Sequence, residues 1–168
     1  LDEAVQDVVG QIGNSRDADL AFVFASTGYA SDLPRILPQL KSKLKVKHWI
    51  GCAGGGVIGT GSSCQPKEIE QTPALSITLL SLPGAEINIV KLNTSSLPDL
   101  DGSAQGWQEW VGVKPEICRS QIIFIDPTSS GINDLMRGLD YAYPDSKRIG
   151  GIAGPHLAPH GSLFFDEA

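Results

Sequence analysis

The sequence has few cysteines, no excess of positive charge and no long run of purely apolar residues, and each shortage excludes a class of protein. Three cysteines, Cys52, Cys64 and Cys118, are too few and odd in number for a disulfide framework, so we expect a reducing intracellular compartment: the cytoplasm, or an organelle such as the plastid stroma. A net charge of −6 disfavours a nucleic-acid partner. Residues 48–66 carry no formal charge but contain six glycines, so we expect no membrane insertion.

What the chain does have is enough apolar sequence for one core. Its 168 residues are 41% hydrophobic, which fits a single folded domain over residues 1–168 and disfavours disorder. An apolar helical stripe is already under way at Leu1, and a strand pattern is still under way near the last residue. We therefore expect a fragment of a longer chain.

The first half of the chain predicts a strand–helix–strand unit. Residues 20–25 form a continuous apolar run, which is typical of a strand buried on both faces. Leucine and isoleucine then recur at helical spacing over residues 33–44, and residues 47–52 give a second strand that runs into the glycines at 54–56. A strand, a helix and a strand within about 30 residues predict a parallel βαβ unit.

The second half repeats this pattern. Residues 121–126 are a second buried strand, residues 132–143 carry a helical stripe, and residues 147–153 return as a strand that ends in glycine. Two interpretations stay open, because any two βαβ units resemble each other, whereas a pseudo-symmetric pair in one sheet would bring both glycine-rich turns to the same edge.

The middle of the chain predicts strands with one solvated face. Apolar and polar residues alternate over 75–79 and again over 87–89, around Pro83-Gly84, which predicts an antiparallel hairpin. The fold class is therefore α/β: a mixed sheet of about seven strands, with two βαβ units flanking the hairpin and helices packed on the sheet. Further elements are expected as a helix over residues 1–12, a short helix carrying Trp107 and Trp110, and a strand from 162 to 165.

The ligand site is predicted at the carboxyl ends of the parallel strands, where open α/β sheets bind small molecules. Backbone amides of the glycine-rich turns could hold a carboxylate, and an acid at a strand end could meet an amino group. Capping the next helix or closing a turn is the alternative role of that acid. The residues expected to bind ligand are Gly54, Gly55, Gly56, Asp126, Gly150 and Gly151.

These segments together resemble the N-terminal FIST domain. The resemblance is carried by Leu20–Ser26, Ile50–Gly59, Leu79–Gly84, Ile122–Pro127, Leu139–Pro144, Ile149–Gly154 and Gly161–Phe164, in the family's order. It implies an intracellular sensory and signalling module, with amino acids suggested as ligands. The companion C-terminal FIST domain is missing from this chain, and the resemblance supplies no catalytic residue.

Motifs that would indicate other chemistry lack their context. The spacing Gly54-x-Gly56-x-x-Gly59 matches a dinucleotide fingerprint, but no helical pattern and no acid about 20 residues further on follow it. Pro155 and Pro159 each directly precede one of the histidines His156 and His160, and these prolines disfavour the helix that a zinc pair would need. We therefore predict no cofactor, no metal and no catalytic residue.

Three functional hypotheses follow. The first is a non-catalytic sensory domain that binds a small molecule, and amino acids are the suggested class. The second is a scaffold or linker subunit held by protein partners in a larger assembly. The third, for which the sequence offers least support, is an enzyme using Cys52 or Asp126.

Overall fold

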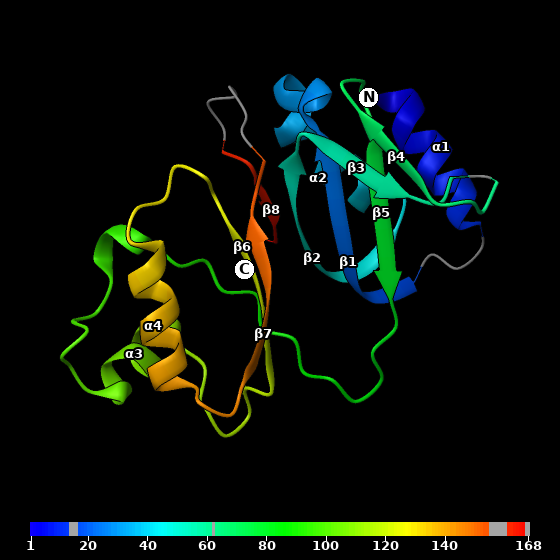
Figure 1. Cartoon of the computed structure of the whole chain (residues 1–168). Helices are drawn as coiled ribbons and strands as arrows, with labels where there is room; N and C mark the ends of the chain where they lie inside the picture. The colour runs from blue at the N-terminus through cyan, green and yellow to red at the C-terminus, as the bar shows by residue number, and fades with distance from the viewer. Residues whose placement is uncertain (14–16, 62, 155–160, 167–168) are drawn as a thin grey trace. The chain divides into compact units, whose positions relative to one another are not determined.

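A computed structural model of the chain describes residues 1–13, 17–61, 63–154 and 161–166. The fold is α/β, and the described residues form eight strands in mixed and two-stranded sheets together with four α-helices (Figure 1). The chain divides into two compact units. Unit 1 comprises residues 1–89 and 153–168, and unit 2 comprises Val90–Ile152.

Unit 1 is built on a mixed sheet of four strands in the order β5-β1-β2-β8. The predicted first βαβ unit is confirmed, because β1 (Asp17–Ser26) and β2 (Lys45–Gly54) pair in parallel around α2 (Leu33–Lys41). A short 3-10 helix, η1 (Thr27–Asp32), leads into α2. The two outer strands, β5 (Leu75–Leu80) and β8 (Leu163–Phe165), run antiparallel to β1 and β2 respectively.

The core of unit 1 lies between the sheet and two helices. The helix α1 (Asp2–Ile12) buries Val5 and Val9, and α2 buries Leu33, Ile36 and Leu40. Both stripes follow helical spacing and were predicted from it. The sheet supplies alternate residues of each strand, as the period of two requires: Ala21, Val23 and Ala25 from β1, Trp49 and Ala53 from β2, and Phe164 from β8.

The other face of this sheet is crossed by an antiparallel hairpin. It consists of β3 (Gly56–Gly59) and β4 (Lys67–Glu70), which pass over β1 and β5 in Figure 1. Ser76 of β5 donates a hydrogen bond to the carbonyl of Ile58 at 3.0 Å. The glycine-rich segment predicted as a turn is therefore strand on both sides of one bend at Gly55.

The hairpin predicted over residues 75–79 and 87–89 is wrong in its second strand. Residues 75–80 do form a strand, but residues 85–93 lie outside helices and strands. The physical reason is that β5 pairs with the distant β1, in a register that joins Val23 to Ile77 and directs Ile77 toward the helices.

Unit 2 contains the second βαβ unit, which is also confirmed. The strands β6 (Ser120–Ile125) and β7 (Lys147–Ile152) pair in parallel around α4 (Ile132–Ala142). The predicted tryptophan helix is α3 (Ala104–Val111), and a short 3-10 helix, η2 (Thr94–Ser96), precedes it. The core of this unit is a separate cluster: Trp107, Val111, Ile125, Leu135, Leu139, Ala142 and Tyr143.

None of the helices within the described ranges has the length and apolar character that crossing a membrane requires.

Candidate ligand-binding site

The first group of predicted site residues surrounds the bend between β2 and β3. Gly54 is paired with Ser26 in the β1–β2 ladder, and Gly56 is paired with Glu70 in the hairpin. A β-carbon on Gly56 would fall 2.8 Å from the carbonyl oxygen of Ile69, so this glycine is required by close strand approach. Gly55 belongs to neither ladder and is exposed, and no described atom lies within 4 Å of where its β-carbon would be. Of the three glycines, Gly55 has room for a ligand.

A later segment of unit 1 packs its backbone against this bend. A β-carbon on Gly154 would fall 2.7 Å from both the α-carbon of Gly54 and the nitrogen of Gly55. The nitrogen of Gly154 donates to the carbonyl of Ala53 at 3.0 Å, and the nitrogen of Ala53 donates to the carbonyl of Ser162 at 2.7 Å. The end of β2 is thus held by backbone from two later parts of the chain, which fixes the position of the bend.

The neighbouring end of β1 is held by a buried serine. The hydroxyl of Ser26 donates to the carbonyl of Thr72 at 2.8 Å and accepts from the nitrogen of Ala74 at 2.8 Å. Only 1% of this residue is exposed. Because its hydroxyl donates to one backbone group and accepts from another, Ser26 holds the end of β1 in place and is not arranged as a nucleophile.

The second group of predicted residues lies in unit 2, at the carboxyl ends of β6 and β7. Asp126 directly follows β6, and its Oδ1 accepts from the nitrogen of Thr128 at 2.9 Å and from the Thr128 hydroxyl at 2.6 Å. The carboxylate therefore closes a turn, as one of its two predicted structural roles requires. It does not cap α4, whose N-cap position is Gly131.

The two glycines of β7 have different environments. A β-carbon on Gly150 would fall 1.9 Å from the carbonyl oxygen of Ile123, so close strand packing excludes a side chain there. Gly151 is exposed, with no described atom within 4 Å of its β-carbon position, and it pairs with Phe124, two residues before Asp126. Gly151 lies one residue before the end of β7, and Asp126 directly follows the end of the adjacent strand β6. The six predicted residues form two groups, one in each unit.

The environment of Cys52 does not activate it. The side chain is half-buried on β2, and burial raises the pKa of its thiol above the ordinary value of 9.0. At neutral pH the thiol stays protonated, whereas a catalytic cysteine needs the thiolate. The three cysteines are unbridged.

The predicted histidine pair, His156 and His160, lies outside the described residues. Among the residues that are described, no group of three or more His, Cys, Asp or Glu side chains is arranged to hold a metal ion.

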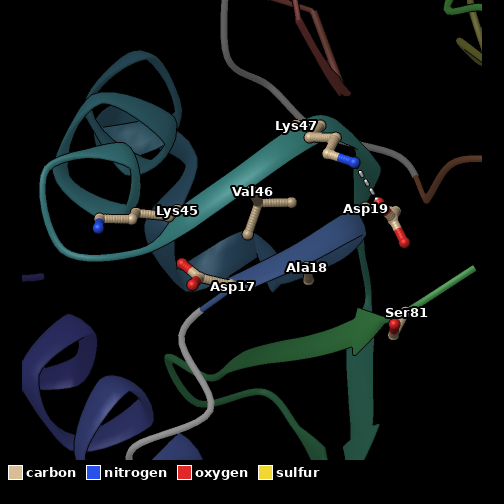
Figure 2. A pocket seen from close by; sticks show the side chains of 7 residues that line it. All are labelled: Asp17, Ala18, Asp19, Lys45, Val46, Lys47 and Ser81. Carbon is tan, nitrogen blue, oxygen red and sulfur yellow. Dashed lines mark hydrogen bonds and ion pairs between the residues drawn. The ribbon is translucent and has the colours of Figure 1, made fainter. Parts of the chain in front are cut away.

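The sequence analysis missed a hollow at the opposite, amino ends of β1 and β2. Asp17 and Asp19 from β1 face Lys45 and Lys47 from β2 around a space of about 560 Å³, and Figure 2 shows Val46 between the two lysines. Lys47 Nζ bonds Asp19 Oδ1 at 2.7 Å. The sequence did contain a pattern that predicts this hollow. Acidic residues alternate at the start of β1 and lysines alternate at the start of β2, and parallel pairing places these two strand ends side by side.

A second hollow of about 660 Å³ adjoins the same end of β2. Lys45, Val46 and Lys47 line both hollows. The further lining residues of the second are Lys41, Leu44, His48, Trp49, Ile87, Asn88, Ile89 and Asp166.

Two βαβ units whose second strands contain or run into glycines define the chain as an α/β module. The family model described as the FIST N domain matches residues 19–168, and the chain belongs to this family. FIST domains are sensory and signal-transduction modules and are not known for catalysis. No curated protein and no solved structure matches the chain.

Proposed function

We propose that this chain is a sensory domain that binds a small molecule without transforming it, and that free amino acids are the ligand class. The observation that carries the proposal is the glycine bend at the end of β2, in a chain that belongs to a family of sensory modules. The bend lies at the carboxyl ends of parallel strands, and Gly55 leaves space for a ligand to approach the main chain.

Each unit supplies its own set of candidate contacts, and each set is proposed by itself. Gly54, Gly55 and Gly56 of unit 1 offer main chain for a carboxylate, whereas Asp126, Gly150 and Gly151 of unit 2 are the candidate contacts for an amino group. Asp126 would neutralise the ammonium group with the carboxylate that also closes its turn. Of the two glycines in this set, Gly151 has the open side.

The first test is a thermal-shift screen with the amino acids. A ligand at 100 times its Kd stabilises a protein by about 2.7 kcal/mol, which raises the unfolding temperature measurably. Gly55→Val should abolish the shift of an amino acid that binds at the bend, because the new side chain fills the open space. Gly10→Ala is the matched control, since Gly10 is exposed on α1 and also has no described atom within 4 Å.

The role of Asp126 is tested without disturbing its turn. Asp126→Asn keeps an oxygen that accepts from Thr128 but removes the charge. We expect at least about a tenfold loss of affinity, because a desolvated ammonium loses a charged partner worth ~1.5–3 kcal/mol. Unchanged affinity in a folded Asp126→Asn variant would remove Asp126 from the site, and no shift with any amino acid would remove that ligand class.

A scaffold role in a larger assembly is the second candidate, and one observation favours it. Ile122 of β6 and Ile149 of β7 are paired in register and are 43% and 73% exposed. Adjacent exposed isoleucines on a sheet face are typical of a protein contact. If this function holds, Ile149→Lys should prevent co-purification of a partner from the native source while thermal shifts with amino acids stay absent.

The proposed setting is intracellular and reducing. The unbridged Cys52, Cys64 and Cys118 support this compartment. The net charge of −6 supports a separate part of the proposal, which is that the chain has no nucleic-acid partner. A cytoplasmic or plastid site would be distinguished by imaging the tagged full-length protein.

A further inference from the structure

We infer that the hollow beside the amino end of β2 is a second small-molecule site, and that it takes a small organic carboxylate with an aliphatic body. This site is separate from the glycine bend, which ends the same strand, and it does not depend on the sensory function proposed above. Local positive charge, one lysine and the apolar residues beneath it point to this ligand.

The local charge is opposite to that of the whole chain. The net charge is −6, yet residues 41–48 contain four lysines and a histidine and no acid. Parallel pairing and the turn after α2 gather Lys41, Lys45, Lys47 and His48 around one hollow of about 660 Å³, a volume typical of small-molecule pockets. An anion is therefore the ligand that this lining attracts.

Two of these lysines already have partners. Lys47 is bonded to Asp19 at 2.7 Å, and Lys41 forms an ion pair with Asp166. The side chain of Lys45 makes no hydrogen bond or ion pair with any residue that the structure describes, and it is exposed. Because Asp166 is neutralised by Lys41, it does not compete for Lys45. Asp17, the partner of Lys45 in the β1–β2 ladder, lines the first hollow and not this one. Lys45 is the group that would bind the carboxylate.

Apart from Asn88, the rest of the lining is apolar. Ile87 and Ile89 are half-buried beside the hollow, and Leu44 and Trp49 are buried behind it. Phosphate or sulfate would leave these surfaces uncovered, whereas an aliphatic acid would cover them and gain the free energy of burying its own carbon atoms. Ile87 and Ile89 alternate with polar residues but do not lie in a strand, and their side chains line this hollow instead.

The experiment titrates the protein with 4-methylpentanoate and, as the neutral counterpart, with 4-methylpentanamide, and measures Kd by NMR. We expect the acid to bind more tightly than the amide, and its binding to weaken with added salt. Lys45→Gln should weaken acid binding by about two- to fivefold, the range for an exposed ion pair, while leaving the weak binding of the amide unchanged.

Lys43→Gln is the matched control, since Lys43 is an exposed lysine of the same segment and does not line the hollow. It should leave both dissociation constants unchanged. Equal binding of acid and amide, or equal effects of the two variants, would overturn the inference. Circular dichroism confirms folding, and Gly55→Val should leave acid binding intact, so failure of the glycine-bend site is a separate outcome.

Discussion

Gly138 of α4 lies against the indole ring of Trp107 of α3, so closely that a β-carbon on residue 138 would fall 2.1 Å from the Cη2 atom. Trp107 is fully buried and also donates from Nε1 to the carbonyl of Asp99 at 3.2 Å. The ring is therefore fixed at both its edges. It follows that the interhelical distance in unit 2 is set by the absence of a side chain at residue 138.

The first prediction is that Gly138→Ala destabilises the protein. Overpacking costs about 1–3 kcal/mol and outweighs the gain of up to ~1 kcal/mol in helix propensity. Gly10→Ala on the exposed face of α1 has only the propensity gain, so its sign should be opposite. Urea denaturation followed by tryptophan fluorescence measures both, and stabilisation by Gly138→Ala would contradict the packing argument.

The second prediction concerns Arg148, whose side chain is 11% exposed. It donates to Gln121 Oε1 at 2.7 Å and to the carbonyls of Leu139 and Tyr143 at 2.5 and 3.0 Å, and it pairs with Asp140. Arg148 thus joins β6, β7 and the end of α4, where it also complements the helix dipole.

Arg148→Ala leaves these carbonyls without their charged donor, so we expect a loss of about 2–3 kcal/mol in unfolding free energy. Arg148→Lys should recover only part, because an ammonium cannot reproduce the planar fork. Chemical denaturation measures the series. Asp140→Ala removes only the exposed ion pair and keeps the bonds from Arg148 to the helix end. We expect this variant to lose less than about 1 kcal/mol in unfolding free energy.

Most of the local fold could be predicted from the sequence, because helices and buried strands have characteristic patterns of hydrophobic residues. The stripe of α1 and the run of β6 are examples, and both were predicted close to their observed bounds. The helix α3 was predicted from its two tryptophans, without bounds. The strand at Gly56–Gly59 was missed because glycine contributes nothing to an apolar pattern. Its partner Lys67–Glu70 is largely polar, so hydrophobic alternation is equally absent there.

Non-local pairing was the other limit. The alternation at 75–79 correctly indicated a strand, but it could not indicate that the partner is β1, some 50 residues earlier, rather than residues 87–89. The same limit hid the charged hollow. Asp19 and Lys47 are far apart in sequence, and only the parallel register of β1 and β2 makes them neighbours.

The third prediction follows from that pair. The hydrogen bond from Lys47 and then the bond from the nitrogen of Leu82 lower the pKa of Asp19 below its ordinary value of 3.8. The folded state therefore releases this proton more readily than the unfolded state does. The associated stabilisation is complete above the ordinary pKa and is lost as the pH falls through the lowered one.

Urea midpoints measured from pH 7 to pH 2 should show this acid-side loss, and Asp19→Asn should make the fall shallower. Asp17→Asn removes a charge from the same strand but leaves the Lys47 pair intact, so it should retain the wild-type profile. Identical profiles for wild type and Asp19→Asn would show that the pair does not contribute.

The last prediction distinguishes Cys52 from Cys64 and tests the thiol-enzyme hypothesis. Burial raises the pKa of the Cys52 thiol, so little thiolate is present at pH 7, whereas Cys64 is exposed. Iodoacetamide at pH 7 should therefore alkylate Cys64 well before Cys52, and the rate at Cys52 should rise steeply only above pH 9. Mass spectrometry of peptides sampled over time measures both rates in one experiment. An activated nucleophile at residue 52 would reverse the order, because a thiolate reacts at neutral pH even when it is half-buried, and Cys52→Ser would then abolish the rapid phase.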